Sequence, residues 1–394
     1  MLEHLHTCAD MRASADMAAM PPAPIQRLSR LAPLDEIYAH IDALAKPVTP
    51  HELPIGQAVG LVLGRDATAP ASVPPCAIAL RDGFAIASDR VVDAGPYAPV
   101  LLEPAPAWVE SGDPLPAGAD AVLPPEDVAS SNGVAEVLAA ASPGDNVLPA
   151  GMDASALAPL RRAGERLRPT DVAALRAAGI DRVWTRAPRI RIVRTHPQAD
   201  DAKDFVGVLI ADAVRREGGQ GSSVWAPSGP DLERELAHDA CDAVVAIGGT
   251  GMGKGDASVH TLARLGRVDI HGMGIRPGER AALGIVESRP VLLLPGRLDA
   301  ALAAWLLIGR HLQARLAGGA ATEAAVPVIL CRKITSTIGL AEMIPVGACE
   351  GGVEPLASGY FPLQSLARAA GWIFVSPESE GFPPGATVEL RPFP

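Results

Sequence analysis

Between residues 187 and 320, short apolar segments typical of strands alternate with longer segments that have the apolar spacing of helices. Residues 243–247 are apolar at every position, as expected of a strand buried on both faces, whereas residues 189–195 alternate. The expected strands cover 189–195, 222–226, 243–247, 268–271 and 291–294, and the expected helices cover 204–217, 231–240, 256–265 and 299–317. This succession predicts an α/β domain in which helices cover both faces of a parallel sheet.

The segments on either side of this region have other patterns. Leu34 to Leu44 reads as an amphipathic helix, and Thr170 to Ala178 as a short helix capped by Thr170. From Glu52 to about Leu138, short apolar runs separated by proline, glycine and aspartate indicate a β-rich unit. Similar short runs with one helix, from Val326 to the C-terminus, predict a separate β domain. A chain of 394 residues is also too long for one core.

The composition excludes some classes of function. A net charge of -11 argues against nucleic acid as the main partner, because phosphate binding needs a basic face. No uncharged apolar run approaches the roughly 20 residues that a bilayer requires, so no membrane span is expected. The five scattered cysteines suggest no disulfide framework and favour a reducing compartment, and we expect a cytoplasmic protein. Residues 1–30 lack a secretory signal and are expected to form a disordered tail.

Four arginines lie close together before the helix at 170–178, namely Arg161, Arg162, Arg166 and Arg168. A charged face in solvent is the simpler interpretation of this basic cluster, because exposed charges need no partner. A ligand-binding role is the alternative.

A glycine-rich loop follows the apolar strand at 243–247. Its members are Gly248, Gly249, Thr250, Gly251, Met252 and Gly253. Such a chain can turn tightly and bring bare backbone close to a ligand. Asp256 can cap the next helix, whose N-terminal N–H groups suit a phosphate or another oxyanion. An ordinary connection between a strand and a helix is the alternative.

Two nucleotide-binding patterns are nearly matched in this loop, and both fail. Gly248, Gly253 and Lys254 have the P-loop spacing, but Gly255 stands where Ser or Thr would hold Mg²⁺. The dinucleotide-binding fingerprint fails at its third glycine. A second turn, Leu294-Pro295-Gly296-Arg297, follows another expected strand. Because the carboxyl ends of parallel strands meet at one edge, we expect the two turns to lie together there.

The glycine-rich loop and Asp256 resemble the Gly-Gly-x-Ser-x-Gly…Asp loop of the MoeA family, the molybdopterin molybdenumtransferases that include the gephyrin E domain. Five other segments resemble motifs of that family in the same order, namely Arg81 to Ala85, Ser111-Gly112 with Asp120 to Val122, Gly144 to Val147, Ile275 to Gly278 and Leu294 to Gly296. The resemblance covers about Leu34 to the C-terminus. Six collinear matches are much more specific than any single loop.

The resemblance implies a multidomain protein of α/β plus β class, active as a homodimer. The implied domains are a tail at 1–30, a discontinuous elongated linker domain at 31–52 and 141–186, an inserted β-rich domain at 53–140, a three-layer α/β molybdopterin-binding domain at 187–320, and a C-terminal β-barrel domain at 325–394. The active cleft of the family lies between the α/β domain of one protomer and the inserted region of the other.

The resemblance also implies a reaction, in which molybdate is inserted into adenylylated molybdopterin with Mg²⁺ as cofactor and AMP is released. The implied catalytic residues are Asp82, Asp256 and Arg276, and Asp82 and Asp256 are the implied Mg²⁺ ligands. The implied substrate-binding residues are Gly248, Gly249, Thr250, Gly251, Gly253, Ser111, Pro295, Gly296 and Arg297. A turn residue and a helix cap are the plainer interpretations of Asp82 and Asp256.

Several positions depart from the family motifs. Gly251 stands where the family has Ser, Arg276 where it has Lys, and residues 194–199 lack two acidic residues. Fewer carboxylates weaken Mg²⁺ binding, and fewer Lys and Ser side chains weaken the binding of molybdate or phosphate. The alternative is therefore a non-catalytic binding or carrier protein for molybdopterin or the molybdenum cofactor. Expected partners are a pterin phosphate, other cofactor-synthesis proteins and molybdoenzymes.

Overall fold

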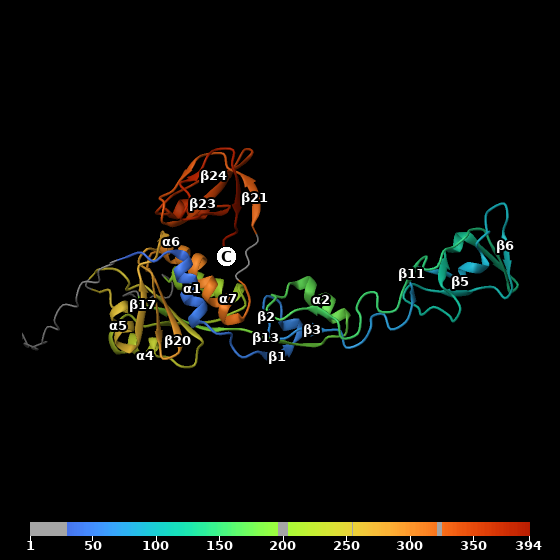
Figure 1. The fold of residues 1–394 in the computed structure, drawn as a ribbon, viewed down its shortest axis with the longest axis horizontal. Helices are drawn as coiled ribbons and strands as arrows, with labels where there is room; N and C mark the ends of the chain where they lie inside the picture. The colour runs from blue at the N-terminus through green and yellow to red at the C-terminus, as the bar shows by residue number, and fades with distance from the viewer. Residues whose placement is uncertain (1–29, 196–203, 254, 321–324) are drawn as a thin grey trace, which may run out of the picture.

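The computed structural model describes residues 30–195, 204–253, 255–320 and 325–394. The chain is elongated, with the α/β part and the C-terminal strands at one end and a β-rich unit at the other (Figure 1). The expected tail lies outside the described residues except for Arg30, and so does Lys254. No helix in the described part of the chain is long and apolar enough to cross a membrane.

A six-stranded sheet forms the centre of the α/β part, in the order β15-β14-β16-β20-β19-β17. The strands are β14 (Arg189–Arg194), β15 (Gln220–Trp225), β16 (Ala243–Ile247), β17 (Arg267–His271), β19 (Ala282–Val286) and β20 (Arg289–Leu294). The first four strands in this order are parallel, but β19 and β17 run antiparallel to their neighbours. The expected parallel sheet is therefore wrong at this edge. The cause is β19, which the pattern missed and which Glu287, at φ 56°, joins to β20 in a tight hairpin.

Helices cover both faces of this sheet and give three layers. They are α3 (Phe205–Arg216), α4 (Gly229–Leu236), α5 (Ser258–Leu265), α6 (Leu298–Ala304) and α7 (Arg310–Ala317). One core contains residues of α3, α6 and α7, and the other contains residues of α4 and α5. The expected helix at 299–317 is present, but a π-helical turn, η5 (Trp305–Gly309), separates α6 from α7. Alternate residues of β16 face the two cores, which explains why this strand is apolar throughout.

The N-terminal helix α1 (Leu34–Leu44) packs on the α/β part. Ile37 and Ile41 are fully buried in the same core as α6 and α7. Tyr38 Oη donates a hydrogen bond to the Leu307 carbonyl at 2.7 Å. The first stretch of the implied linker domain, 31–52, therefore includes a helix whose contacts are with the α/β core.

Segments from both sides of the inserted region build the middle of the molecule. They form the sheet β1-β13-β2 and the pair β3–β12, with α2 beside them. Their bounds are β1 (His51–Pro54), β2 (Val62–Leu63), β3 (Ala67–Thr68), β12 (Pro159–Arg161), α2 (Pro169–Ala177) and β13 (Arg182–Arg186). The expected cap at Thr170 is wrong, because α2 begins at Pro169 and the Asp171 carboxylate accepts the N–H of Arg168 at 2.8 Å.

The inserted unit contains three small sheets, β4–β11, β7-β5-β8 and β6-β10-β9. Their bounds are β4 (Ile78–Ala79), β5 (Gly83–Ile86), β6 (Val100–Leu102), β7 (Ala107–Val109), β8 (Ala121–Leu123), β9 (Val128–Ser131), β10 (Val134–Val137) and β11 (Val147–Leu148). The β-rich character expected from the short apolar runs is confirmed.

The C-terminal part consists of short sheets around one long strand, β23. The elements are β18 (Ile275–Arg276), β21 (Val326–Ile329), β22 (Ile334–Thr335), β23 (Ala341–Cys349), β24 (Gly352–Pro355), α8 (Leu363–Arg368), β25 (Gly371–Val375), β26 (Gly381–Phe382) and β27 (Thr387–Leu390). β23 pairs with β18, β24 and β25, while β21 pairs with β27 and β22 with β26. A closed barrel is not found among these pairings and stays a prediction.

Candidate functional site

The glycine-rich loop forms a tight turn that hydrogen bonds hold in place. The Gly248 N–H donates to the Leu294 carbonyl at 2.8 Å, and Ser258 Oγ donates to the Gly248 carbonyl at 2.8 Å. Gly248 and Gly249 have φ values of 101° and 69°. A Cβ on Gly249 would overlap Ser258 Oγ, so both the backbone conformation and the space available favour glycine.

Asp256 folds back onto this loop instead of capping α5. Its Oδ2 accepts the Gly253 N–H at 2.6 Å, whereas α5 begins at Ser258 without a side-chain cap. The expected helix-cap role of Asp256 is therefore wrong. A Cβ on Gly251 would lie 2.6 Å from Asp256 Oδ2, so a side chain at this position requires the Asp256 carboxylate to move. The glycine that replaces the serine of the family motif therefore leaves room for the Asp256 carboxylate beside the loop.

The second turn lies directly beside the glycine-rich loop. Strands β16 and β20 are parallel neighbours with Ile247 opposite Leu294, and a Cβ on Gly296 would lie 3.4 Å from Gly248 Cα. Thr195, at the end of β14, is buried and donates its hydroxyl to the Ile247 carbonyl at 2.9 Å. The carboxyl ends of three strands therefore meet at one edge, as the strand pattern predicted.

His271, at the end of β17, also reaches the glycine-rich loop. The Thr250 backbone is close enough to act on the pKa of its ring, and Thr250 is itself buried. Burial is the main cause that lowers the pKa of His271, and the Thr250 backbone opposes this shift. No local pattern in the sequence indicated this contact.

Arg297 is positioned by residues of two different parts of the chain. Its Nε lies 3.1 Å from Asp299 Oδ1, and its guanidinium carbon lies 4.7 Å from the centroid of the Tyr360 ring. The Asp299 carboxylate in turn accepts the Phe361 N–H at 3.1 Å. The C-terminal part of the chain therefore helps to hold the cation next to Gly296.

Arg276 is held by two carboxylates. Its Nη1 lies 3.2 Å from Glu342 Oε1, and its Nε lies 3.4 Å from Glu279 Oε1. Glu342, on β23, is only 1% exposed, and burial raises its pKa, while the charge of Arg276 opposes that rise. Sequence reasoning did not find Glu342 or Tyr360, because both lie far along the chain from the arginines that they contact.

Asp82 and Ser111 lie together in the inserted unit. Asp82 Oδ1 accepts the Ser111 N–H at 2.8 Å, and Ser111 Oγ donates to the Leu80 carbonyl at 3.2 Å. Both residues are exposed. Figure 1 shows this unit, with β5 and β11, at the opposite end of the chain from α5 and β20. Within one chain, Asp82 lies beside Ser111, and the glycine-rich loop lies beside Pro295-Gly296. The first pair is far from the second, at the opposite end of the molecule (Figure 1).

Some motif residues stabilise the fold of the inserted unit. Asp120 accepts the N–H of Ser88 at 2.7 Å and its hydroxyl at 2.9 Å. Asn146, at φ 56°, donates its side-chain amide to the Val122 carbonyl at 2.8 Å. These two positions of the collinear motifs therefore have a structural explanation.

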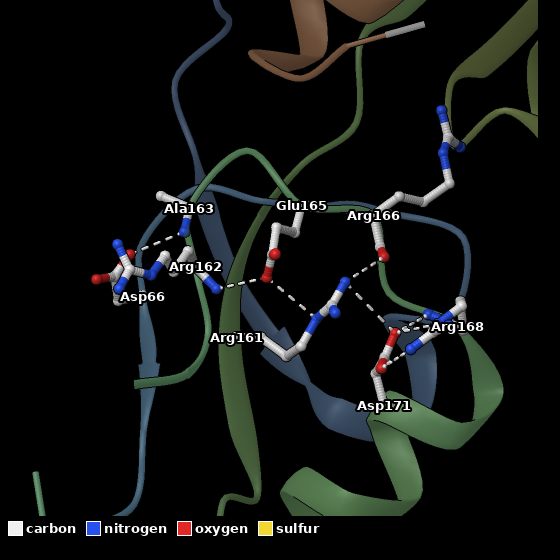
Figure 2. Close-up of polar contacts among 8 residues, drawn as sticks. All are labelled: Asp66, Arg161, Arg162, Ala163, Glu165, Arg166, Arg168 and Asp171. Atoms are coloured by element: carbon white, nitrogen blue, oxygen red, sulfur yellow. Dashed lines mark hydrogen bonds and ion pairs between the residues drawn. The ribbon is translucent and has the colours of Figure 1, made fainter. Parts of the chain in front are cut away.

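The basic cluster contacts the protein itself, as Figure 2 shows. Arg161 lies 3.1 Å from Glu165 Oε2, and Arg168 lies 2.9 Å from Asp171 Oδ1. Arg166 donates to the Gly60 carbonyl at 2.8 Å, and burial lowers its pKa. These pairings favour a structural role over a ligand-binding role for these three arginines.

No group of three or more His, Cys, Asp and Glu side chains within the described ranges is placed to hold a metal ion. Two cavities, of about 320 and 590 Å³, lie elsewhere. The first is lined by Arg194, Asp204 and Arg215, and the second by residues 333–338 and 380–383. Neither includes the glycine-rich loop, which therefore lies outside both cavities.

Comparison with known proteins identifies the family. The model of the MoeA N-terminal region (domain I and II) matches residues 32–179, and that of a probable molybdopterin binding domain matches residues 207–314. The chain belongs to the MoeA family. A solved MoeA relative, the molybdopterin biosynthesis MoeA protein from Pyrococcus horikoshii OT3, is 25% identical, with a TM-score of 0.78 over 92% of this chain and 100% of that one.

Two further proteins are similar to this chain in sequence. A putative molybdopterin biosynthesis protein from Methanocaldococcus jannaschii is 24% identical over 371 residues, 86% of this chain and 91% of that protein. Molybdopterin molybdenumtransferase 2 from Mycobacterium tuberculosis is 27% identical over 308 residues, 68% of this chain and 74% of that protein. The MoeA-family assignment thus rests on both halves of the chain.

Proposed function

We propose that this chain inserts molybdate into adenylylated molybdopterin with release of AMP, as a step of molybdenum cofactor synthesis. The observation that carries this proposal is the edge where Gly248 and Gly296 approach each other with no side chain between them. Bare backbone at the carboxyl ends of strands suits the phosphate end of a pterin substrate. The names of relatives as molybdenumtransferases support the same reaction.

Two positioned arginines suit the charge of the reactants. Arg297 directly follows Gly296, and Arg276 is fixed by Glu342 and Glu279. The substrate carries phosphate groups and molybdate is an anion, so positioned guanidinium groups stabilise both. In this proposal the glycine-rich loop binds the substrate, and the two arginines bind the negative charge of its phosphates and of molybdate.

We further propose that the active cleft forms between two protomers of a homodimer. Asp82 and Asp256, the proposed catalytic carboxylates, belong to opposite ends of the elongated chain (Figure 1). A two-fold dimer can place the inserted unit of each protomer against the α/β part of its partner. Asp82 is suited to such contact because its side chain is exposed and its orientation is fixed by the Ser111 N–H.

Mg²⁺ enters the proposal as a cofactor that Asp82 or Asp256 would hold together with substrate oxygens. Mg²⁺ in phosphoryl-transfer sites is commonly held by one or two carboxylates plus phosphates, and a cage of three protein carboxylates is not required. Each of these aspartates has one carboxylate oxygen hydrogen-bonded to a backbone N–H, which fixes the direction of the other oxygen. When bound, the ion would neutralise phosphate charge.

The test of the reaction uses the full chain with adenylylated molybdopterin, molybdate and Mg²⁺. We expect AMP release that depends on molybdate and is lost when Mg²⁺ is removed with a chelator. Pterin binding without any AMP release would overturn the proposal and favour the alternative, a binding or carrier protein. That alternative is not favoured, because relatives matching most of the chain are named transferases.

The test of the shared cleft uses heterodimers of Asp82→Asn and Asp256→Asn protomers, isolated with two affinity tags. If each cleft takes Asp82 from one protomer and Asp256 from the other, one of the two clefts stays intact. The heterodimer should then keep about half of the wild-type AMP release per dimer, whereas AMP release by each variant homodimer should fall by about 100-fold. An inactive heterodimer, or a chain that is monomeric in solution, would contradict the shared cleft.

Architecture and location complete the proposal. The proposed domains are 31–52 with 141–186, 53–140, 187–320, and a closed barrel at 325–394. We also propose a cytoplasmic protein that passes its product to another cofactor-synthesis protein or a molybdoenzyme. Limited proteolysis tests the domain boundaries, since cleavage concentrates in exposed connections between compact units.

A further inference from the structure

Cys331 and Cys349 lie side by side in the C-terminal part, although they are far apart in sequence. Cys349 ends β23 and is paired with Gly352 across the hairpin to β24. The Cys331 N–H donates to the Val353 carbonyl at 2.8 Å, one residue further along the same strand. These two backbone pairings bring both cysteines to the tip of the β23–β24 hairpin.

The thiol of Cys331 reaches the residue next to Cys349. Cys331 Sγ lies 3.5 Å from the carbonyl oxygen of Glu350, which directly follows Cys349 in the chain. Both side chains are partly exposed, in contrast to Cys241, which is buried. A small reagent in solution can therefore reach a pair of thiols that are already neighbours. Neither cysteine belongs to the proposed active site.

We propose that Cys331 and Cys349 form a reversible disulfide by exchange with a small-molecule disulfide such as oxidised glutathione. One cysteine thiolate attacks the glutathione disulfide, forms a mixed disulfide and releases the first glutathione thiol. The second cysteine then loses its proton and attacks the protein sulfur of the mixed disulfide, which releases the second glutathione. The two cysteines are oxidised by two electrons, and glutathione disulfide is reduced to two thiols.

The groups around Cys349 raise the pKa of its thiol and slow this exchange at neutral pH. The hydrogen bond with Cys331 is the main cause that raises the pKa of Cys349 to about 11, and Glu354 on β24 raises it further. Arg332 faces the same strand but lies 3.4 Å from Glu354, so its charge is partly balanced. Because the thiolate is the attacking form, the rate should rise by up to about tenfold per pH unit below that pKa.

The disulfide would add a covalent bond between two elements that backbone hydrogen bonds and the Arg332–Glu354 ion pair already link. It connects the chain after β21 to the hairpin of β23 and β24, and β23 also carries Glu342 at its other end. Cross-linking restricts the unfolded chain, so the oxidised form should unfold at a higher temperature than the reduced form.

The test begins with the reduced full chain in buffers of increasing oxidised-to-reduced glutathione ratio. Remaining thiols are alkylated, and the digested peptides are analysed by mass spectrometry. We expect a peptide pair joined through Cys331 and Cys349, which disappears when the reduced thiol is restored. Cys331→Ser and Cys349→Ser should abolish this cross-link, and the matched control Cys76→Ser, at an exposed thiol in another part of the chain, should keep it.

Three outcomes would overturn the proposal. In the first, both thiols stay fully alkylated at every glutathione ratio. In the second, Cys331 and Cys349 carry only glutathione adducts without a link between them. In the third, one of the pair is linked to Cys76. Because the readout is the covalent bond, it does not depend on whether the chain transfers molybdenum.

Discussion

The two ends of the molecule differ in how they present their candidate residues. At the α/β end, β16 and β20 are buried at every position, and the glycine-rich loop is fastened by hydrogen bonds from Ser258 and to Leu294. At the inserted end, small cores support short strands, and Asp82 is exposed. The proposed function assigns the two ends different roles, in which the rigid backbone edge binds the ligand and the exposed carboxylate of a second protomer is brought to it.

The largest expected effect is a loss of stability on replacing a glycine at positive φ. Comparing one such glycine at each end separates the cost of side-chain crowding from the cost of the backbone conformation. Gly249→Ala forces a side chain at positive φ against the buried Ser258, whereas Gly112→Ala, in the inserted unit, also has positive φ but has no atom within 4 Å. We expect Gly249→Ala to lower the free energy of unfolding by about 3 kcal/mol and Gly112→Ala by about 1 kcal/mol. Urea denaturation measures both, and equal losses would mean that the loop is not tightly packed.

The second prediction concerns chemistry at the inserted end. Asp82→Asn keeps the shape of an exposed side chain but removes its charge, so we expect AMP release to fall by about 100-fold with the unfolding temperature unchanged. The matched control is Asp93→Asn, an exposed aspartate of the same unit, which should retain full activity. Unchanged activity of Asp82→Asn would leave the inserted end without a catalytic role.

The third prediction concerns the positioning of Arg276. Glu342→Gln preserves the size of this buried side chain but removes the charge that holds Arg276, while Glu279 remains. We expect KM for adenylylated molybdopterin to rise by about fivefold with kcat little changed, because binding of the anion is weakened. Glu389→Gln, at an exposed position, is the control. A fall in kcat alone would argue against a positioning role.

The smallest expected effect lies in the linker that joins the two ends. The hydrogen bond from Arg168 is the main cause that lowers the pKa of Asp171 to about 2 from an ordinary 3.8. Because the folded pKa is the lower one, this contribution is present above pH 3.8 and is lost as the pH falls towards 2. Arg168 is exposed, so we expect Asp171→Asn to lower the free energy of unfolding by only about 1 kcal/mol at pH 7.

The acid dependence provides the check on that value. Wild-type stability should fall between pH 3.8 and about 2 by more than the stability of Asp171→Asn, measured by urea denaturation at each pH. Parallel curves would show that the carboxylate is not stabilised by its partner. The pair is shown with its neighbours in Figure 2.

The sequence predicted best those elements that a single period defines. The apolar runs 243–247 in β16 and 291–294 in β20 were expected as strands because burial on both faces favours apolar residues at every position. β19 was missed because its turn at Glu287 lacks the usual glycine or asparagine, and β23 because Pro345 and Gly347 interrupt it. The local sequence pattern therefore predicted strands that are buried along their whole length. It failed for strands whose existence depends on a turn or on pairing with a neighbouring strand.

The candidate site shows the same limit. The meeting of the two turns followed from parallel strands, but the partners of their cations could not be predicted. Glu342 and Tyr360 reach Arg276 and Arg297 only through the packing of the C-terminal part on the α/β part. Likewise, the position of Asp256 depends on the loop conformation, since its carboxylate can bond either to the helix that follows or to Gly253.

The inserted unit leaves the rest of the chain and returns to it at adjacent points. Ile78 is paired with Leu148, and Val73 with Ala154, so the outgoing and returning segments run side by side. A protein whose insertion begins and ends at neighbouring positions can gain, lose or exchange that insertion without rebuilding its other domains. The unit that presents Asp82 is therefore a separable module, which evolution or an engineer could replace while the α/β end is kept.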